Sequence, residues 1–196
     1  MNILVTGERG YLCRSIINEL PSNNIIKYER DVRLNKVFSN IDMIIHFASP
    51  SERCEFKDIK KTTTTIIDGT INMIRIANTN KAKLVFASTM GVHTFGVDDV
   101  YCSCKRAMEH YIIANCDNYL ITRIPRVYSS CRKKGLIKSL IDNTVNETDF
   151  DVCVDYLDLK DFKRQFLNSL HLKNTIYEFT EIKTNTIREI KKIYVQ

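Results

Sequence analysis

The sequence contains no long run of apolar residues, which excludes a membrane-spanning protein. No stretch approaches the roughly 18 consecutive apolar residues that a membrane-spanning helix needs. The first expected strand begins at Asn2, so the charged and apolar regions of a signal peptide have no room before it. We therefore expect a protein of the cytoplasm that makes no membrane contact.

Cysteine pairs and metal-ligand patterns are also missing. The seven cysteines are an odd number, and Cys102 and Cys104 have neither a second pair nor a histidine cluster near them in the sequence. Reduced thiols in a reducing compartment are the simpler interpretation, and no metal site is predicted.

Patterns for nucleic-acid binding are absent, although the chain is basic. Its 29 Lys and Arg residues against 23 Asp and Glu residues give a net charge of +6. There is no zinc finger, no RNP-like run and no basic stripe interleaved with aromatic residues. The positive charge suits a small anionic ligand or a lysine-rich surface, so no nucleic-acid partner is expected.

What the sequence does contain is a regular alternation of apolar strands and amphipathic helices. Its 196 residues, 44 % hydrophobic and 27 % charged, are typical of one globular domain with a small annex. Expected strands lie near 3–5, 25–28, 42–48, 83–87 and 119–122, and expected helices near 12–20, 59–77 and 100–114. This order predicts an α/β fold with a doubly wound parallel (Rossmann) sheet and right-handed crossovers.

The pattern changes after Tyr128, and we expect the chain to divide there. Residues 1–128 would form the Rossmann domain, and residues 129–196 a smaller C-terminal part interleaved with it. Expected strands in the C-terminal part lie near 151–157 and 175–179, and expected helices near 136–141, 158–170 and 186–194.

The first twenty residues carry a candidate dinucleotide site. A strand leads into a turn with Gly7 and Gly10, and a helical pattern follows. Gly7 permits the tight turn, Gly10 lets the backbone approach a pyrophosphate, and the helix N-terminus supplies amide N–H groups. The usual third glycine is Cys13 here. Two glycines after a strand are also common in ordinary turns, so this motif needs support from the rest of the chain.

Charged residues follow the second expected strand. Glu29 lies 22 residues past Gly7, about where a dinucleotide fold places an acid on the adenosine ribose. Arg30 beside it would instead receive a 2′-phosphate, so NAD and NADP both remain open. A charged strand end in solvent is the alternative to either role.

Tyr101 and Lys105 lie one helical turn apart, on the same helix face. A phenol with a pKa near 10 is a poor general base at neutral pH, and a neighbouring lysine cation is expected to lower that pKa. Thr89 follows a buried strand, and its hydroxyl would hydrogen-bond the reacting oxygen.

Together these motifs resemble the short-chain dehydrogenase/reductase superfamily. The closer resemblance is to its extended branch of NAD-dependent nucleotide-sugar epimerases, dehydratases and reductases. Further matching stretches are Asp42 with His46-Phe47-Ala48, Gly69-Thr70-Ile71-Asn72, Phe86-Ala87-Ser88-Thr89, Arg123–Tyr128 and Tyr156–Asp161. The resemblance implies hydride transfer to or from a sugar carbon, with NAD or NADP as cofactor and residues 129–196 as the substrate part.

The resemblance also implies roles for individual residues. The catalytic residues would be Thr89, Tyr101 and Lys105, with Lys105 also holding the nicotinamide ribose. The cofactor-binding residues would be Gly7, Arg9, Gly10, Tyr11, Leu12, Glu29, Asp31, Phe47, Ala48, Ser49 and Lys105. Arg123 and Arg126 would meet the diphosphate of the substrate. Arg132 is interpreted as solvated, and His46 as packed and hydrogen-bonded at a strand end.

Several positions depart from the family pattern and leave two hypotheses open. Cys13 replaces a glycine, Ile66 replaces an asparagine, and Met90-Gly91 replace the Asp-Glu pair of the 4,6-dehydratases. The third departure argues against a dehydratase, so the leading hypothesis is a reductase or epimerase of a nucleotide-linked keto-sugar. The alternative is a catalytically degenerate dinucleotide-binding regulator or scaffold.

A homodimer is a further expectation from the family. Its members often pair the Tyr/Lys helix and its neighbour against a twin in a four-helix bundle. Ile112 and Ile113 would serve such a face, although core packing explains them equally well.

Overall fold

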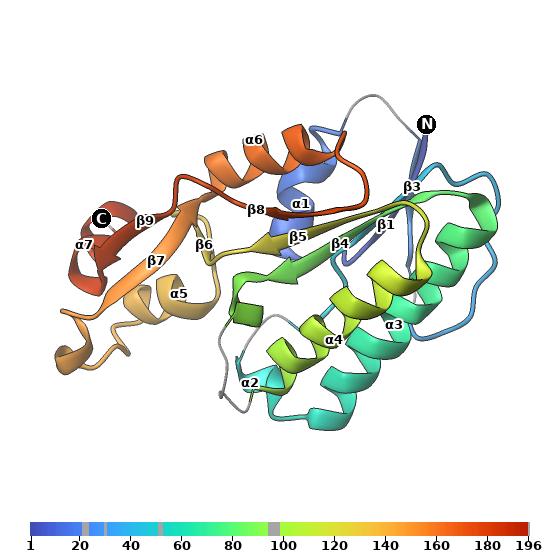
Figure 1. The fold of residues 1–196 in the computed structure, drawn as a ribbon. Coiled ribbons are helices and arrows are strands. Elements are labelled where there is room, and N and C mark those ends of the chain that lie inside the picture. The colour runs from blue at the N-terminus through green and yellow to red at the C-terminus, as the bar shows by residue number, and fades with distance from the viewer. Residues whose placement is uncertain (21–23, 30, 51–52, 94–98, 196) are drawn as a thin grey trace.

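A six-stranded parallel sheet runs through the centre of the protein (Figure 1). This computed structural model describes residues 1–20, 24–29, 31–50, 53–93 and 99–195. The strand order is β2-β1-β3-β4-β5-β8. The strands are β1 (Asn2–Thr6), β2 (Asn24–Lys27), β3 (Met43–His46), β4 (Lys83–Thr89), β5 (Tyr119–Ile124) and β8 (Thr175–Glu178). Every pair of neighbours is parallel, so the predicted doubly wound sheet is confirmed.

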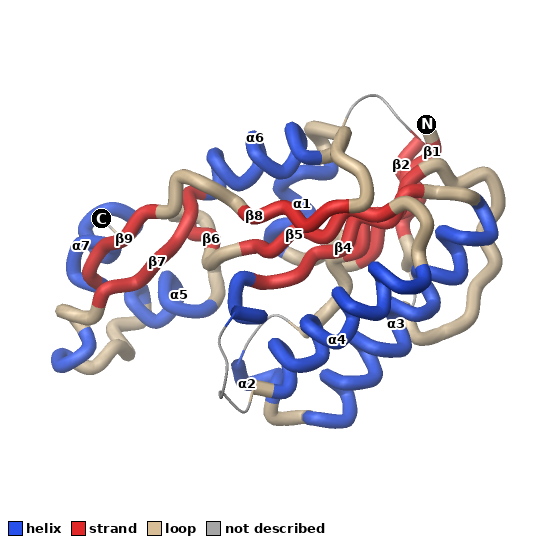
Figure 2. The backbone as a smooth tube through the Cα atoms, in the orientation of Figure 1, coloured by secondary structure: helices blue, strands red, loops and turns tan. Residues whose placement is uncertain are grey.

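Helices cover both faces of this sheet, as Figure 2 shows. The helices α3 (Ile59–Asn80) and α4 (Val100–Asn115) lie on one face, and α1 (Tyr11–Ile17) and α6 (Leu159–Ser169) on the other. Alternate residues of β4 serve the two layers: Leu84 and Phe86 pack toward α3 and α4, whereas Val85 and Ala87 pack toward the opposite layer. A strand buried on both faces needs a continuous apolar run, which is what the central strands have.

Tertiary packing holds the threonine-rich helix α3. Four consecutive threonines are poor helix formers, and residues 62–65 are all threonine. The Asp58 side chain caps the helix by accepting from the backbone N–H of Lys61 at 2.9 Å. Ile66 and Met73 are fully buried in the core below it, and their burial offsets the weak local preference.

A second, three-stranded sheet lies beside the first. It consists of β6 (Val127–Tyr128), β7 (Cys153–Asp158) and β9 (Lys183–Thr186), in the order β6-β7-β9. The helices α5 (Gly135–Ile141) and α7 (Ile187–Tyr194) pack on it around Tyr128, Ile137 and Tyr156. Between β7 and β9 the chain returns to the main sheet through α6 and β8, so the C-terminal part is interleaved with the N-terminal part (Figure 1).

Short elements complete the fold. They are α2 (Arg53–Phe56) and two 3₁₀ turns, η1 (Met90–His93) and η2 (Glu147–Asp149). The sequence pattern predicts none of these three, nor β6 and β9, because each is too short to show a period. No helix in the described part of the chain is long and apolar enough to cross a bilayer.

Candidate active site

The strand order reverses between β1 and β3, and this is where an open α/β sheet binds its ligands. Gly7 follows the carboxyl end of β1 with a φ of +73°. A Cβ at Gly7 would lie 2.8 Å from the backbone nitrogen of Ala48, just beyond β3. Glycine is therefore required here by conformation and by space, and the predicted residues Gly7, Phe47 and Ala48 do meet at one point.

The turn after β1 presents backbone donors. The Gly10 N–H donates to the Gly7 carbonyl at 2.8 Å, and Gly10 is the N-cap residue of α1. It offers no side chain to cap the helix, so the N–H groups of the first turn are not satisfied by a capping side chain. A glycine cradle with such donors fits the pyrophosphate of a dinucleotide.

Cys13 fills the position where the third glycine is expected. Its side chain is fully buried, with Sγ 3.9 Å from the carbonyl oxygen of Thr6 on β1. Burial raises the pKa of the Cys13 thiol to about 12. The thiol is therefore an uncharged packing group between α1 and β1.

Tyr11 connects the glycine turn to the C-terminal part. Its hydroxyl hydrogen-bonds the Ser129 hydroxyl at 2.7 Å. The Arg132 guanidinium lies 4.9 Å from the Tyr11 ring centroid and donates to the Val127 carbonyl at 2.9 Å. Arg132 is thus half-buried beside the turn, whereas the sequence favoured a solvated side chain.

The segment after β2 is anchored rather than loose. Glu29 is exposed, and Asp31 accepts from the backbone and Nε of Arg33 at 3.0 and 2.8 Å, which holds the pKa of Asp31 below its usual value. The Asn72 side chain on α3 donates to the carbonyls of Val32 and Leu34, each at 2.9 Å. Arg30, the predicted alternative contact for a 2′-phosphate, lies outside the described residues.

The predicted catalytic residues converge at the carboxyl end of β4. Asp99 caps α4 by accepting from the Tyr101 N–H at 2.9 Å. Lys105 is 1 % exposed, and its Nζ donates to the Ala87 carbonyl of β4 at 2.7 Å. That Nζ lies 5.7 Å from the Tyr101 ring centroid. Thr89 ends β4, and its Oγ1 accepts from the Gly91 N–H at 3.2 Å.

Tyr101 has two partners from other elements. Ser49, which follows β3, hydrogen-bonds its hydroxyl. The Phe56 ring of α2 stacks on the Tyr101 ring, with centroids 4.6 Å apart and planes 11° from parallel. The contact with Ser49 joins a predicted cofactor residue to a predicted catalytic residue. Phe56 carried no signal in the sequence, since α2 has only four residues.

Burial controls the charges of Tyr101 and Lys105. It raises the pKa of Tyr101 to about 12, against a smaller lowering by the Ser49 hydrogen bond. It also lowers the pKa of Lys105 to about 7, against a raising effect of Glu109. The expected lowering of the tyrosine pKa is therefore wrong for this structure, because burial of the phenol raises that pKa by more than the Ser49 hydrogen bond lowers it.

His46 is packed and hydrogen-bonded, as interpreted from the sequence. Its Nδ1 lies 2.6 Å from Thr6 Oγ1, and its Nε2 lies 3.1 Å from Thr70 Oγ1. Burial and the nearby Lys105 lower the pKa of His46 to about 3, so the ring is neutral. Thr6 Oγ1 also accepts from the Ala48 N–H at 3.2 Å, which fixes the backbone that faces Gly7.

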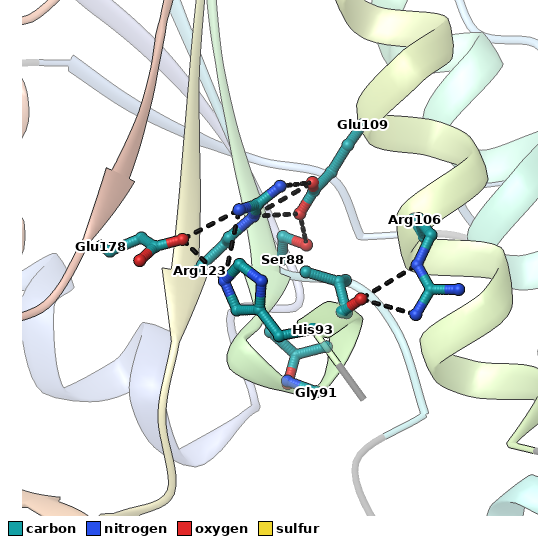
Figure 3. Close-up of polar contacts among 9 residues, drawn as sticks. Ser88, Gly91, His93, Arg106, Glu109, Arg123 and Glu178 are labelled. Atoms are coloured by element: carbon teal, nitrogen blue, oxygen red, sulfur yellow. Dashed lines mark hydrogen bonds and ion pairs between the residues drawn. The ribbon is translucent and has the colours of Figure 1, made fainter. Parts of the chain in front are cut away.

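Arg123 is held in an ion-pair network on the side of β5 (Figure 3). Its guanidinium lies 2.7 Å from Glu109 of α4 and 2.8 Å from Glu178 of β8. One of its nitrogens also lies 3.3 Å from Nε2 of His93. Arg126, by contrast, is exposed. The geometry thus separates the two arginines that the sequence grouped together.

Residues 3–168 match the family described as the NAD dependent epimerase/dehydratase family. The chain belongs to this family. The match spans β1 through α6 and therefore includes the glycine turn and the Tyr101/Lys105 helix. The comparison with curated proteins found no matching sequence.

Solved structures of similar fold come from nucleotide-sugar enzymes. The dTDP-glucose 4,6-dehydratase DesIV of Streptomyces venezuelae, with NAD bound, is 18 % identical with a TM-score of 0.84, over 100 % of this chain and 80 % of that chain. The UDP-glucose 4-epimerase of Thermotoga maritima, with UDP-glucose, is 16 % identical with a TM-score of 0.78, over 98 % and 81 %. The dTDP-4-dehydrorhamnose reductase of Bacillus anthracis, with NADP, is 18 % identical with a TM-score of 0.78, over 97 % and 78 %. At these identities the likeness establishes the fold alone.

Proposed function

We propose that the protein binds NAD or NADP at the β1–β3 crevice and reduces a carbonyl of a nucleotide-linked sugar. Family membership and the glycine cradle at Gly7 support the cofactor. The reductase, epimerase and dehydratase among the similar folds support a nucleotide-sugar substrate. Met90 and Gly91 stand where a 4,6-dehydratase has acids, which argues against elimination.

The chain's own residues would divide the work at the end of β4. The dinucleotide, when bound, supplies the hydride. Tyr101 donates its phenolic proton to the carbonyl oxygen of the substrate, and the Thr89 hydroxyl hydrogen-bonds the same oxygen. Lys105 holds the nicotinamide ribose. Stacking on Phe56 and the hydrogen bond with Ser49 fix the ring of Tyr101 for the transfer.

The convergence of Thr89, Tyr101 and Lys105 at the carboxyl end of β4 is the observation that carries the proposal. Carbonyl reduction needs a group that begins protonated, whereas oxidation of an alcohol needs one that begins as a base. Burial raises the pKa of Tyr101 to about 12, so the phenol keeps its proton at neutral pH. A phenol that keeps its proton suits the role of acid in carbonyl reduction.

The remaining binding residues are proposed from their positions in the fold. For the cofactor we propose Gly7, Arg9, Gly10, Tyr11, Leu12, Glu29, Asp31, Phe47, Ala48, Ser49 and Lys105. For the substrate diphosphate we propose Arg126 and residues 129–196, and we leave out Arg123 because Glu109 and Glu178 already pair with it. We also propose a homodimer that pairs through α3 and α4.

Two buried side chains support the alternative, a dinucleotide-binding regulator without turnover. Ile66 lies fully buried in the apolar core where the family has an asparagine, so a polar contact near the site is missing. Cys13 occupies the position of the third glycine. Both changes leave the crevice in place, and a regulator needs only the crevice.

The experiment that separates these functions follows the absorbance of NADH or NADPH during incubation with a panel of nucleotide 4-keto-sugars. Consumption that disappears in Tyr101→Phe would support the reductase. Cofactor binding without consumption, unchanged in Tyr101→Phe, would favour the regulator. Failure to bind either dinucleotide would contradict both.

A further inference from the structure

Glu109 is a buried carboxylate on α4 that the proposed chemistry does not use (Figure 3). It is 2 % exposed. It accepts a hydrogen bond from the Ser88 hydroxyl, and its Oε2 accepts from Nε and Nη2 of Arg123 at 3.1 and 2.7 Å. A buried carboxylate is costly unless it is paired and hydrogen-bonded, and here it is both.

The same helix face carries Lys105 one turn earlier. Consecutive residues of β4 hold the two side chains: the Ala87 carbonyl accepts from Lys105 Nζ at 2.7 Å, and the Ser88 hydroxyl donates to Glu109. Lys105 and Glu109 therefore lie one turn apart on the same helix face, and each is held by its own hydrogen bond at the end of β4.

Few other charges are available to Lys105. The titratable groups that the described residues place around it are Glu109, Cys104 and Tyr101 on α4 and His46 on β3. Burial raises the pKa of Cys104 and of Tyr101 and lowers that of His46, so all three are neutral near pH 7. Glu109, which forms an ion pair with Arg123, is the carboxylate in this group.

We propose that Glu109 is a positioning residue that stabilises the cationic form of Lys105, with Ser88 and Arg123 fixing its carboxylate for that task. Glu178 and His93 contact Arg123 on its other side and have no part in this role. The stabilisation of the Lys105 cation by Glu109 does not require a bound cofactor. Its consequence for catalysis, a lysine that stays charged beside the nicotinamide ribose and Tyr101, rests on the proposed function.

The test titrates Lys105 in the cofactor-free protein by NMR of ¹⁵N-lysine side chains, with the signal assigned through Lys105→Arg. Wild type is expected to titrate at about pH 7. In Glu109→Gln the midpoint is expected to fall by about one pH unit. This is the low end of the effect of removing a neighbouring opposite charge, because Arg123 also pairs with the carboxylate. Glu178→Gln is the matched control, since it removes the other carboxylate on Arg123 and should leave the midpoint in place.

Two outcomes would overturn the proposal: an unchanged midpoint in Glu109→Gln, or an equal fall in Glu178→Gln. If Glu109→Gln does not fold, the double change Glu109→Gln with Arg123→Met removes the carboxylate together with its cationic partner. Its midpoint must still fall, by a smaller amount because loss of the Arg123 cation opposes the change. In an active protein, the alkaline limb of the pH–rate profile should move to lower pH by the same amount. Absence of turnover in wild type would contradict the proposed function and leave the titration result standing.

Discussion

Tyr101 is held at its ring by Phe56 and at its hydroxyl by Ser49. Phe56 belongs to α2, Ser49 follows β3, and Tyr101 lies on α4, so three separate segments determine one side-chain orientation. An acid that must reach a substrate oxygen within hydrogen-bonding distance depends on such support, because small displacements cost rate.

We predict that Phe56→Leu slows turnover while the protein stays folded. Loss of the stacked ring frees Tyr101 to turn, and kcat should fall by about tenfold with little change in KM for the dinucleotide. Steady-state kinetics and a thermal melt would measure both effects. Phe38→Leu, in the segment between β2 and β3 and outside the proposed site, is the control and should leave kcat unchanged. Equal kcat for Phe56→Leu and wild type would contradict the positioning role.

His46 should make the fold sensitive to acid. Its pKa is lowered from 6.5 to about 3, so the unfolded chain binds a proton between these values and the folded protein does not. The stabilising contribution of neutral His46 is therefore complete above pH 6.5 and is lost progressively as the pH falls toward 3. Urea unfolding between pH 7.5 and 4 would measure how the free energy of unfolding depends on pH. This dependence should be weaker in His46→Asn than in wild type, whereas His171→Asn, at an exposed site, should keep the wild-type dependence.

Among whole elements, α1 and α3 do most to shape the crevice. The side chain at Cys13 separates α1 from β1, and a Cβ at Gly69 of α3 would lie 2.7 Å from Val32. Thr70 of α3 meets His46, and Asn72 of α3 holds the segment after β2. The Gly-Thr-x-Asn stretch thus has a physical reason: Thr70 and Asn72 point in different directions from α3, so one short stretch of helix supports two strand ends.

Cys13→Gly is expected to keep the fold and to hold or improve dinucleotide affinity. Removing the thiol lets α1 approach β1, while a buried cavity and a glycine inside a helix cost about 1–3 kcal/mol of stability. Calorimetric titration with NADH and NADPH, together with urea unfolding, would measure the two effects. Cys13→Ala should show a smaller stability loss than Cys13→Gly. A large loss of affinity in Cys13→Gly would mean that the turn binds in another way.

For the molecule as a whole, a buried lysine connects the central sheet to the C-terminal part of the chain. Lys83 begins β4, is 5 % exposed, and donates to the carbonyls of Leu170, at 2.6 Å, and Leu172, just beyond α6. Burial lowers its pKa to about 8. The contact therefore fastens the C-terminal part to the central sheet with a side chain that is only partly charged at mildly alkaline pH.

Lys83→Met should destabilise the protein by about 1–3 kcal/mol, because two half-buried carbonyls lose their donor. The folded pKa lies below the usual 10.5, so burying the cation costs stability below pH 8, and this cost is relieved as the pH rises from 8 to 10.5. The difference in the free energy of unfolding between wild type and Lys83→Met should accordingly increase from pH 7 to pH 9, as measured by urea unfolding. Lys160→Met, on the exposed side of α6, should show neither effect.

The proposed homodimer depends on apolar side chains that α3 and α4 leave outside. Ile113 is 45 % exposed, whereas Ile112 is fully buried and belongs to the core of the subunit. Ile113→Glu should therefore convert a dimer to a monomer in sedimentation experiments, by placing a charge in the interface. Ile193→Glu, exposed on α7, should leave the mass unchanged. A wild-type monomer at all concentrations would contradict the dimer.

Local sequence determined the order of strands and helices, the tight turn at Gly7 and the shared face of Tyr101 and Lys105. These features follow from side-chain period, glycine conformation and the pitch of a helix, all of which act over a few residues. The family match over residues 3–168 covers all of these features.

Tertiary structure alone decided which groups carry charge and which partners they have. Arg123 looked like a substrate contact, yet Glu109 and Glu178, distant in sequence, pair with it. Tyr101 looked like a phenol activated by lysine, yet burial keeps its proton in place. Burial and ion pairing depend on what long-range packing brings around a side chain, and no local period encodes those neighbours.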